Sequence, residues 1–254
     1  MKSSHSGKQG RKSSNTDQLS SAERVYDRLH LEILTFGLIP GETFSEASLA
    51  ARFDFPIAAV RAALSRLRQD GLMINRKRLG HMVRPVTFED IHNTYEMRGL
   101  LEPVAVEKAM KNLDPEVLHK LELELNKAIQ KSDRKSQVKA LFVHREFHLT
   151  IAQASGNQQL EKWIRELSDH VLRFQYLDIR NSEISGQGWQ DQHKDIIAAI
   201  EQGNARKAAE AMKEDIMGGH ELVIQAILNL PEFRKLNLGG SSTDAGNGSE
   251  SLVN

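Results

Sequence analysis

Residues 45–83 read SEASLAARFDFPIAAVRAALSRLRQDGLMINRKRLGHMV, and this stretch determines the fold of the first part of the chain. Ser45 is a good N-cap for a short helix, because its hydroxyl can accept a hydrogen bond from the first turn. The break at Asp54-Phe55-Pro56 ends that helix, and apolar residues at helical spacing then predict a second helix that stops at Gly71. Short apolar segments on either side of the basic turn Arg76-Lys77-Arg78 predict a hairpin. Two short helices followed by a hairpin form a winged helix-turn-helix.

Helical periodicity continues on both sides of this stretch. Upstream, a first helix is predicted by Val25, Leu29, Ile33 and Phe36, and Gly37 ends it. Downstream, no segment has the pattern of a strand, and we expect about six helices, at 88–111, 114–132, 136–154, 158–181, 189–202 and 204–229. The predicted fold class is therefore mainly α, with an N-terminal winged helix-turn-helix and a C-terminal all-α bundle of six or seven helices.

Composition divides the chain into four segments. Residues 1–18 and 233–254 are rich in small and polar residues and are predicted to be disordered tails, because they lack apolar residues to offset the entropy of ordering. Between them we place a small domain at 19–86 and a helical domain at 87–232. The 34 basic and 34 acidic residues are unevenly distributed, since residues 1–86 carry 14 basic and 8 acidic side chains. A basic module joined to an acidic one is typical of a nucleic-acid-binding domain fused to a second domain.

Several classes of protein are excluded at this point. The chain contains no cysteine, which excludes disulfides, a thiol nucleophile, an iron–sulfur cluster and a Cys-ligated zinc site, and is compatible with a reducing cytoplasm. No apolar run approaches the roughly 18 to 20 residues that span a bilayer, and no apolar stretch follows the basic residues at the start. We therefore expect a cytoplasmic protein that has no membrane partner.

The second short helix and the hairpin carry the candidate DNA-binding residues. Arg61 lies near the helix start and is the best candidate to read a base, because an arginine can bind guanine through two hydrogen bonds. The hairpin cations would bind phosphates or a narrow minor groove, although any one of them could instead serve solubility. The full set of DNA-binding candidates is Ser45, Arg61, Ser65, Arg68, Arg76, Lys77, Arg78, Gly80 and His81.

The helical domain contains a candidate metal site. His144 and His148 are four residues apart and therefore share one helix face, while His193 and Asp215 fall on apolar stripes that point to the core. A buried carboxylate is costly unless it is paired or bound to a metal, and three imidazoles with one carboxylate suit zinc, nickel or manganese. Histidine pairs at this spacing also occur without a metal. His220 also lies on an apolar side of its helix and is an alternative to Asp215.

The N-terminal motifs resemble those of GntR-type bacterial transcription regulators over about residues 19–86. One departure concerns residues 56–59, Pro-Ile-Ala-Ala, where the family commonly has Ser-Arg-Thr-Pro and this chain lacks an arginine and a hydroxyl that would read DNA. Arg61 is retained. The matching residues are Val25-Tyr26, Leu29, Ile33, Gly37-Leu38-Ile39-Pro40-Gly41-Glu42, Leu49-Ala50, Val60-Arg61-Ala62-Ala63-Leu64, Leu67, Gly71-Leu72 and Gly80.

The helical part resembles the all-helical FCD-type effector domain of the FadR branch of that family. The motifs that carry this resemblance are Tyr95-Glu96-Met97-Arg98, Leu101-Glu102, Phe147-His148, Ser155-Gly156-Asn157 and His193. In that domain many members bind a metal through an aspartate and three histidines. His148 and His193 match directly, whereas His144 stands where the family has aspartate and Asp215 where it has histidine. The ligand types are thus exchanged but their number is kept.

The resemblance also implies that a small organic acid binds beside the metal and is held by arginine. Arg98 and Arg173 are the candidates for this contact, although either could instead pair with Glu96 or Glu102. The predicted function is a homodimeric, ligand-responsive regulator, most simply a repressor, that binds a palindromic double-stranded DNA operator. The effector would change how the linker at 85–90 holds the two domains. The sequence leaves two alternatives: a metal-responsive regulator with a signalling or structural ion, and a metal-dependent enzyme, for which the sequence offers no acid–base motif. We therefore predict that the protein is not an enzyme.

Overall fold

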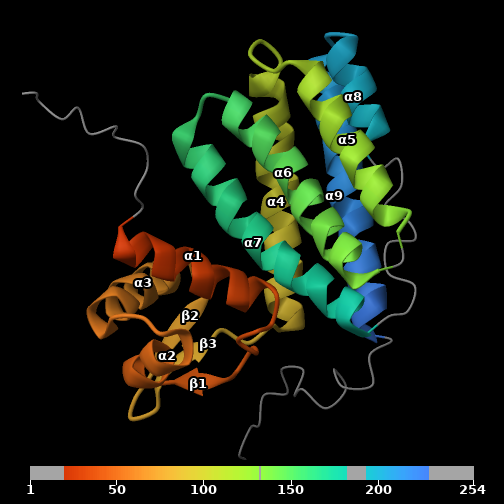
Figure 1. The fold of residues 1–254 in the computed structure, drawn as a ribbon. Helices are drawn as coiled ribbons and strands as arrows, with labels where there is room; N and C mark the ends of the chain where they lie inside the picture. The colour runs from red at the N-terminus through yellow and green to blue at the C-terminus, as the bar shows by residue number, and fades with distance from the viewer. Residues whose placement is uncertain (1–19, 132, 182–192, 229–254) are drawn as a thin grey trace, which may run out of the picture.

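The computed structural model describes residues 20–131, 133–181 and 193–228, so the tails predicted at 1–18 and 233–254 lie outside the described residues. The described chain is mainly helical, as predicted, with a small sheet near its N-terminus (Figure 1). The elements are α1 (Ser21–Leu34), β1 (Thr43–Phe44), α2 (Glu46–Phe53), α3 (Ile57–Gln69), β2 (Met73–Arg76), β3 (Gly80–Val83), α4 (Phe88–Ala109), α5 (Pro115–Ile129), α6 (Arg134–Ala154), α7 (Gln158–Asn181), α8 (Lys194–Glu201) and α9 (Ala205–Leu228). No helix in these described ranges is long and apolar enough to cross a membrane.

Helix starts follow from local hydrogen bonding. Ser45 caps α2 by accepting from the Ser48 amide, and Thr87 caps α4 by accepting from the Asp90 amide. Asp114 and Asp133 cap α5 and α6 in the same way. These caps satisfy amides that have no partner within the helix, and they therefore define where each helix begins.

The winged module has one apolar core and a three-stranded antiparallel sheet in the order β1-β3-β2. The strand β1 was not predicted, because two residues are too short to show an alternating pattern. Gly80 allows β3 to approach β1: its φ is +88°, and an added Cβ would lie 2.5 Å from the carbonyl oxygen of Phe44. Only glycine fits this position without moving the backbone.

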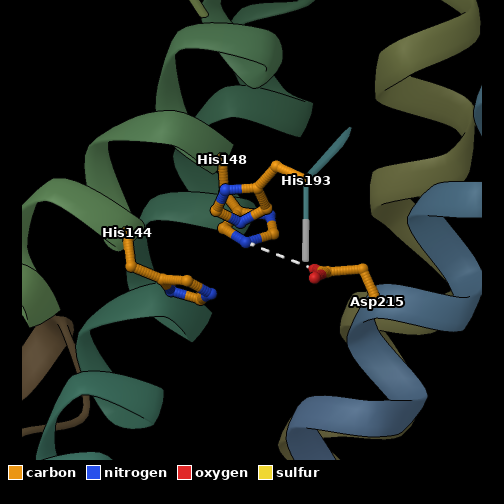
Figure 2. A group of neighbouring side chains, drawn as sticks. All are labelled: His144, His148, His193 and Asp215. Atoms are coloured by element: carbon orange, nitrogen blue, oxygen red, sulfur yellow. Dashed lines mark ion pairs between the residues drawn. The ribbon is translucent and has the colours of Figure 1, made fainter. Parts of the chain in front are cut away.

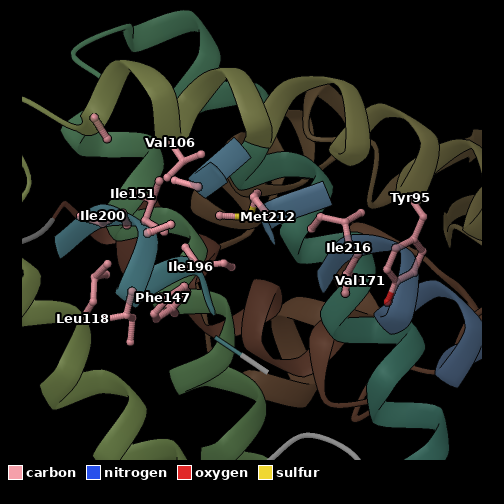
Figure 3. Packing of buried hydrophobic residues seen from close by; sticks show 14 of the residues in the cluster. Tyr95, Val106, Leu118, Phe147, Ile151, Val171, Ile196, Ile200, Met212 and Ile216 are labelled. Atoms are coloured by element: carbon pink, nitrogen blue, oxygen red, sulfur yellow. The ribbon is translucent and has the colours of Figure 1, made fainter. Parts of the chain in front are cut away.

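The helical bundle is held together by apolar side chains from several helices (Figure 3). Phe147 and Ile151 of α6 pack with Ile196 of α8 and with Met212 and Ile216 of α9, and each is at most 2% exposed. Helix α4 contributes to the same core and packs along α9. This core fixes the relative positions of α6, α8 and α9, the region that contains the candidate metal ligands.

The two modules are in direct contact. Leu34 and Phe36, at the end of α1, belong to the same apolar cluster as Leu172 and Tyr176 of α7. This contact places α1 against α7, as Figure 1 also shows. Apolar burial therefore joins the modules in addition to the covalent connection between β3 and α4.

A polar contact lies beside this cluster and connects three helices. Asp169 of α7 accepts from the guanidinium of Arg145 on α6, at 2.6 and 2.7 Å, and its other carboxylate oxygen lies 2.7 Å from Nε2 of His30 on α1. Burial alone would raise the pKa of Asp169, but the hydrogen bond to His30 and the charge of Arg145 lower it. The carboxylate therefore stays ionised while it contacts both modules.

Candidate metal centre and DNA-binding surface

The structure brings together all four residues that the sequence nominates as metal ligands. His144 and His148 lie one turn apart on α6, His193 immediately precedes α8, and Asp215 comes from α9. One ligand atom from each lies within 4.8 Å of the others, and their side chains point toward one another (Figure 2). The three histidines are at most 7% exposed. His220 is not part of this group; its ring instead packs against those of His92 and Tyr95.

Two glutamates orient the imidazoles. Glu102 lies 2.7 Å from Nδ1 of His148, and Glu122 lies 2.8 Å from Nδ1 of His193. Because a carboxylate only accepts, each Nδ1 donates its proton, and this leaves each Nε2 as the ring atom that could bind a metal. Both Nε2 atoms are buried without a hydrogen-bond partner among the described residues. Carboxylates in this position are typical of histidines that bind a metal.

The charge state of the centre also suits a cation. Burial and the neighbouring His148 and His193 lower the pKa of His144 well below its usual value, which keeps its imidazole neutral. The carboxylate of Asp215 lies 3.5 Å from Nε2 of His148, and its Oδ1 is buried without a hydrogen-bond partner in the described chain. Three imidazoles and one carboxylate form a donor set for zinc, nickel or manganese. The residues present therefore fit a divalent ion.

Arg98 pairs with Glu102 in the structure, which is the alternative that the sequence left open. Both side chains are 2% exposed. Burial alone would raise the pKa of Glu102, but Arg98 and His148 lower it to about 2. Arg98 thus holds Glu102 ionised, and Glu102 in turn orients His148.

Arg173, the second candidate for anion binding, lies at the junction of the modules. Its guanidinium donates to the backbone carbonyl of Arg84, which follows β3. The Arg173 side chain is 1% exposed. Burial lowers its pKa to about 10; the nearby charge of Asp90 raises the pKa, and that of Arg84 lowers it further. The contact that the structure gives Arg173 is therefore with the connection to the winged module.

Sequence reasoning did not identify Glu102 and Glu122 as site residues. Glu122 lies on the buried face of α5 with Leu118 and Leu125, at spacings of four and three residues. A carboxylate in an apolar stripe was the signal used for Asp215, and the same signal could have found Glu122.

The predicted DNA-binding residues form one basic surface on the winged module. It surrounds an open hollow of about 630 Å³. Ser45 instead caps α2, and Gly80, besides lining the hollow, has the backbone role described above. The lining residues are Glu46, Arg61, Ser65, Arg68, Asn75, Arg76, Lys77, Arg78, Gly80 and His81.

Glu46 is the acidic exception on this surface and was not predicted. It accepts from Nε of Arg61 at 2.9 and 3.2 Å and from the terminal nitrogen at 2.8 Å. The Arg61 side chain is 68% exposed, so this surface pair holds the guanidinium without burying it. His81 lies 3.8 Å from the same carboxylate.

The departure at residues 56–59 has a structural consequence. Pro56 occupies the N-cap position of α3 and makes no side-chain cap hydrogen bond. Ile57 is 48% exposed and Ala58 is exposed. The first turn of α3 therefore presents apolar groups where the resembled family presents an arginine and a hydroxyl.

The fold and these two sites define a DNA-binding regulator with a second, helical domain that contains a buried polar centre. The model for bacterial regulatory proteins of the gntR family matches residues 21–83, and the FCD domain model matches residues 93–217. The chain belongs to the GntR family and is a DNA-binding transcriptional regulator with an FCD effector domain.

Relatives and solved structures agree with this assignment. An uncharacterized HTH-type transcriptional regulator, YdhC of Bacillus subtilis, is 29% identical over 58% of this chain and 66% of its own length, slightly less than two thirds. The HTH-type transcriptional repressor GlaR of Escherichia coli is 22% identical over 80% of this chain and 95% of its own. The solved structure of E. coli McbR/YncC has a TM-score of 0.70 at 22% identity, covering 82% of this chain and 99% of that one. This likeness supports the fold.

Proposed function

We propose that the protein is a homodimeric repressor whose operator affinity is controlled by a small carboxylate bound beside a divalent ion. The observation that carries this proposal is the convergence of three imidazoles and the Asp215 carboxylate within 4.8 Å, with two imidazoles held by glutamates. When bound, such an ion would supply a position for a carboxylate oxygen. Two relatives, GlaR and RspR of E. coli, are named as repressors, which supports the sign of regulation.

Each group of residues has a task in this proposal. His144, His148, His193 and Asp215 hold the ion, while Glu102 and Glu122 keep two of the imidazoles in the ligating tautomer. The winged module of each subunit binds one half-site, so a dimer in the cytoplasm meets a palindromic operator.

Two contacts between the modules support control of DNA binding from the helical domain. Arg145 follows the ligand His144 directly on α6, and it contacts Asp169, which contacts His30 of the winged module. Arg173 contacts the connection at Arg84. A shift of α6 or α7 on effector binding would therefore change how the winged modules are held relative to adjacent half-sites.

The test is fluorescence anisotropy with DNA from upstream of the protein's own gene, against scrambled DNA of equal length. We expect tight, salt-dependent binding that prefers the native fragment, and a weaker complex when Zn²⁺ and a member of a panel of small carboxylic acids are both added. The variant His148→Ala should lose this response, whereas His119→Ala, which removes a half-exposed histidine paired with Glu201, should keep it. If none of the acids changes the affinity for the native fragment in the presence of Zn²⁺, control by a carboxylate is contradicted.

A metal-responsive regulator is the second candidate, and the pairing of Arg98 favours it. The guanidinium of Arg98 is already held by Glu102, whereas Arg173 donates one terminal nitrogen to the Arg84 carbonyl and its Nε is buried without a hydrogen-bond partner among the described residues. In this case a chelator alone changes operator affinity, and the carboxylic acids have no further effect. The same titration thus separates the two candidates.

A further inference from the structure

A second hollow lies between α4 and α9, apart from the metal centre. Its volume is about 390 Å³, at the lower end of the usual range for small-ligand pockets. On α9 it uses residues on either side of the metal ligand Asp215, with none of the four metal ligands in its lining. Its lining includes Tyr95, Gly99, Leu100, Ile216, Met217 and His220.

A glycine of α4, Gly99, lines this hollow, and two further glycines lie nearby along α9. A Cβ on Gly99 would lie 4.0 Å from Ile216, and a Cβ on Gly219 would lie 3.5 Å from the ring of Tyr95. Gly218 has no atom within 4 Å of its added Cβ. Glycine inside a helix is unfavourable compared with alanine, and here all three lie inside α4 or α9. Of the three, Gly99 lines the hollow, so α4 presents no side chain to the space at that position.

Two residues that line the hollow have a buried polar atom without a hydrogen-bond partner in the described chain. Tyr95 is 4% exposed, and its hydroxyl, which lies against α9 in Figure 3, has no hydrogen-bond partner among the described residues. The buried Nε2 of His220 also has none in that part of the chain, and the two rings are 5.2 Å apart. Buried hydroxyl and imidazole groups are nearly always hydrogen-bonded in folded proteins. Two such atoms beside one hollow indicate a ligand with a hydrogen-bonding group.

The walls and rim define the rest of the ligand. Leu100, Ile216 and Met217 form apolar walls, and Leu100 and Met217 are 61% and 53% exposed. Lys213 and Glu96 are exposed lining residues of opposite sign, so the rim has no net preference for an anion. Burial and the nearby His92 lower the pKa of His220, which keeps this imidazole neutral.

We propose that this α4–α9 pocket binds a small, uncharged, mostly apolar molecule through one hydroxyl or carbonyl group. The Tyr95 hydroxyl and Nε2 of His220 form hydrogen bonds with that group, and the walls cover the apolar part. The site is independent of the carboxylate site proposed above. Because Tyr95 is one turn from Arg98 and Ile216 follows Asp215, its occupant contacts the two helices that support the metal centre.

The probe for the test is 4-fluorophenol, followed by fluorine NMR with the full-length protein and a chelator at neutral pH. We expect saturable line broadening at submillimolar to millimolar concentrations. Fluorobenzene, which lacks the hydroxyl, should bind more weakly. Tyr95→Phe should weaken the binding of 4-fluorophenol roughly threefold to tenfold, which is the range for one net hydrogen bond, and leave the binding of fluorobenzene unchanged. Adding Zn²⁺ should not change either affinity.

Matched variants identify the site. Gly99→Leu should abolish binding, because its side chain enters the hollow at an ordinary contact distance. Met217→Trp closes the pocket from its exposed rim and serves as a second variant if Gly99→Leu fails to fold. Tyr26→Phe makes the same chemical change in the winged module, where the hydroxyl bonds Asp70, and should have no effect.

Four results would overturn the proposal. The first is an absence of saturable binding to the wild type, which is also the result expected if a second copy of the chain covers the pocket. The second is unchanged binding in the folded pocket-filling variant. The third is equal weakening of 4-fluorophenol binding by Tyr26→Phe and Tyr95→Phe. Loss of binding on adding Zn²⁺ would likewise contradict a separate site. None of these results bears on whether a metal and a carboxylate control operator binding.

Discussion

Replacing Glu122 with glutamine tests how the metal centre is built. Glu122 accepts a hydrogen bond of 2.8 Å from Nδ1 of His193 and has a second, long contact of 3.4 Å with Asn126. The amide keeps the shape of the side chain but removes its charge, so His193 becomes a weaker ligand and its tautomer is less firmly held. Loss of such a partner typically lowers metal affinity about 10- to 100-fold, or roughly 1.4 to 2.7 kcal/mol.

The assay is competition for Zn²⁺ between the metal-stripped protein and a chromophoric chelator. Glu201→Gln is the matched control, because Glu201 makes a 2.8 Å contact with Nε2 of the half-exposed His119. This control makes the same chemical change in a glutamate–histidine pair at the surface, and we expect no change in zinc affinity. The same change at Glu102 would be a less specific test, because it would also leave the buried Arg98 without its carboxylate.

An orienting role for Glu122 is refuted if Glu122→Gln binds zinc within about twofold of the wild type while its melting temperature is unchanged, since loss of a carboxylate that orients a metal-binding histidine usually costs tenfold or more in affinity. It is also refuted if Glu201→Gln weakens zinc binding equally.

Three further predictions concern the winged module and its connection. Arg61→Ala should weaken binding to the native DNA fragment by about 1–3 kcal/mol and reduce the preference over scrambled DNA. Lys77→Ala should instead weaken both complexes equally and lower the slope of log affinity against log salt by about 1. Anisotropy at several salt concentrations separates the two effects. Gly80→Ala should destabilise the protein by about 1–3 kcal/mol in urea unfolding, because the residue has φ +88° and an added Cβ would meet the Phe44 carbonyl. Gly203→Ala is the control and should destabilise less, because Gly203 has φ +66° but open space around its Cβ. Equal losses of stability would argue against the backbone contact. Burial opposes ionisation of Asp90, but hydrogen bonds from Thr87 and Arg84 lower its pKa below the ordinary value of 3.8. The ionised carboxylate therefore stabilises the folded protein at pH values above 3.8, and this stabilisation is lost as the pH falls below 3.8. Asp90→Asn should therefore destabilise by about 1 kcal/mol near neutral pH, and the difference from the wild type in urea unfolding should narrow in acid; a constant difference would contradict this.

The long helices were predictable because each has a sustained apolar period and a clear start or stop signal. The expected range 158–181 coincides with α7, and 204–229 differs from α9 by one residue at each end. The winged helix-turn-helix was equally readable from its breaks at Pro56 and Gly71. The strand β1 was missed because two residues carry no period, and it is formed through pairing with β3.

Within the candidate site, spacing identified the residues that share a face, such as His144 and His148, and core-directed stripes identified His193 and Asp215. The partners of these residues could not be obtained in the same way. The hydrogen bond that His193 donates to Glu122 joins residues 71 positions apart, and the contact of Arg173 with Arg84 spans 89 positions. Such pairs depend on how helices dock, which the period of a single helix does not determine.

The contact of Asp169 with His30 and Arg145 has a consequence for genetics. Asp169 lies in the helical domain, far along the sequence from the basic surface, yet its carboxylate holds the first helix of the winged module. A selection for mutants with altered operator control would therefore recover substitutions at position 169 together with substitutions in the reading helix. Second-site suppressors of those alleles should cluster at residues 30 and 145, and their positions would map the boundary between the modules from phenotype alone.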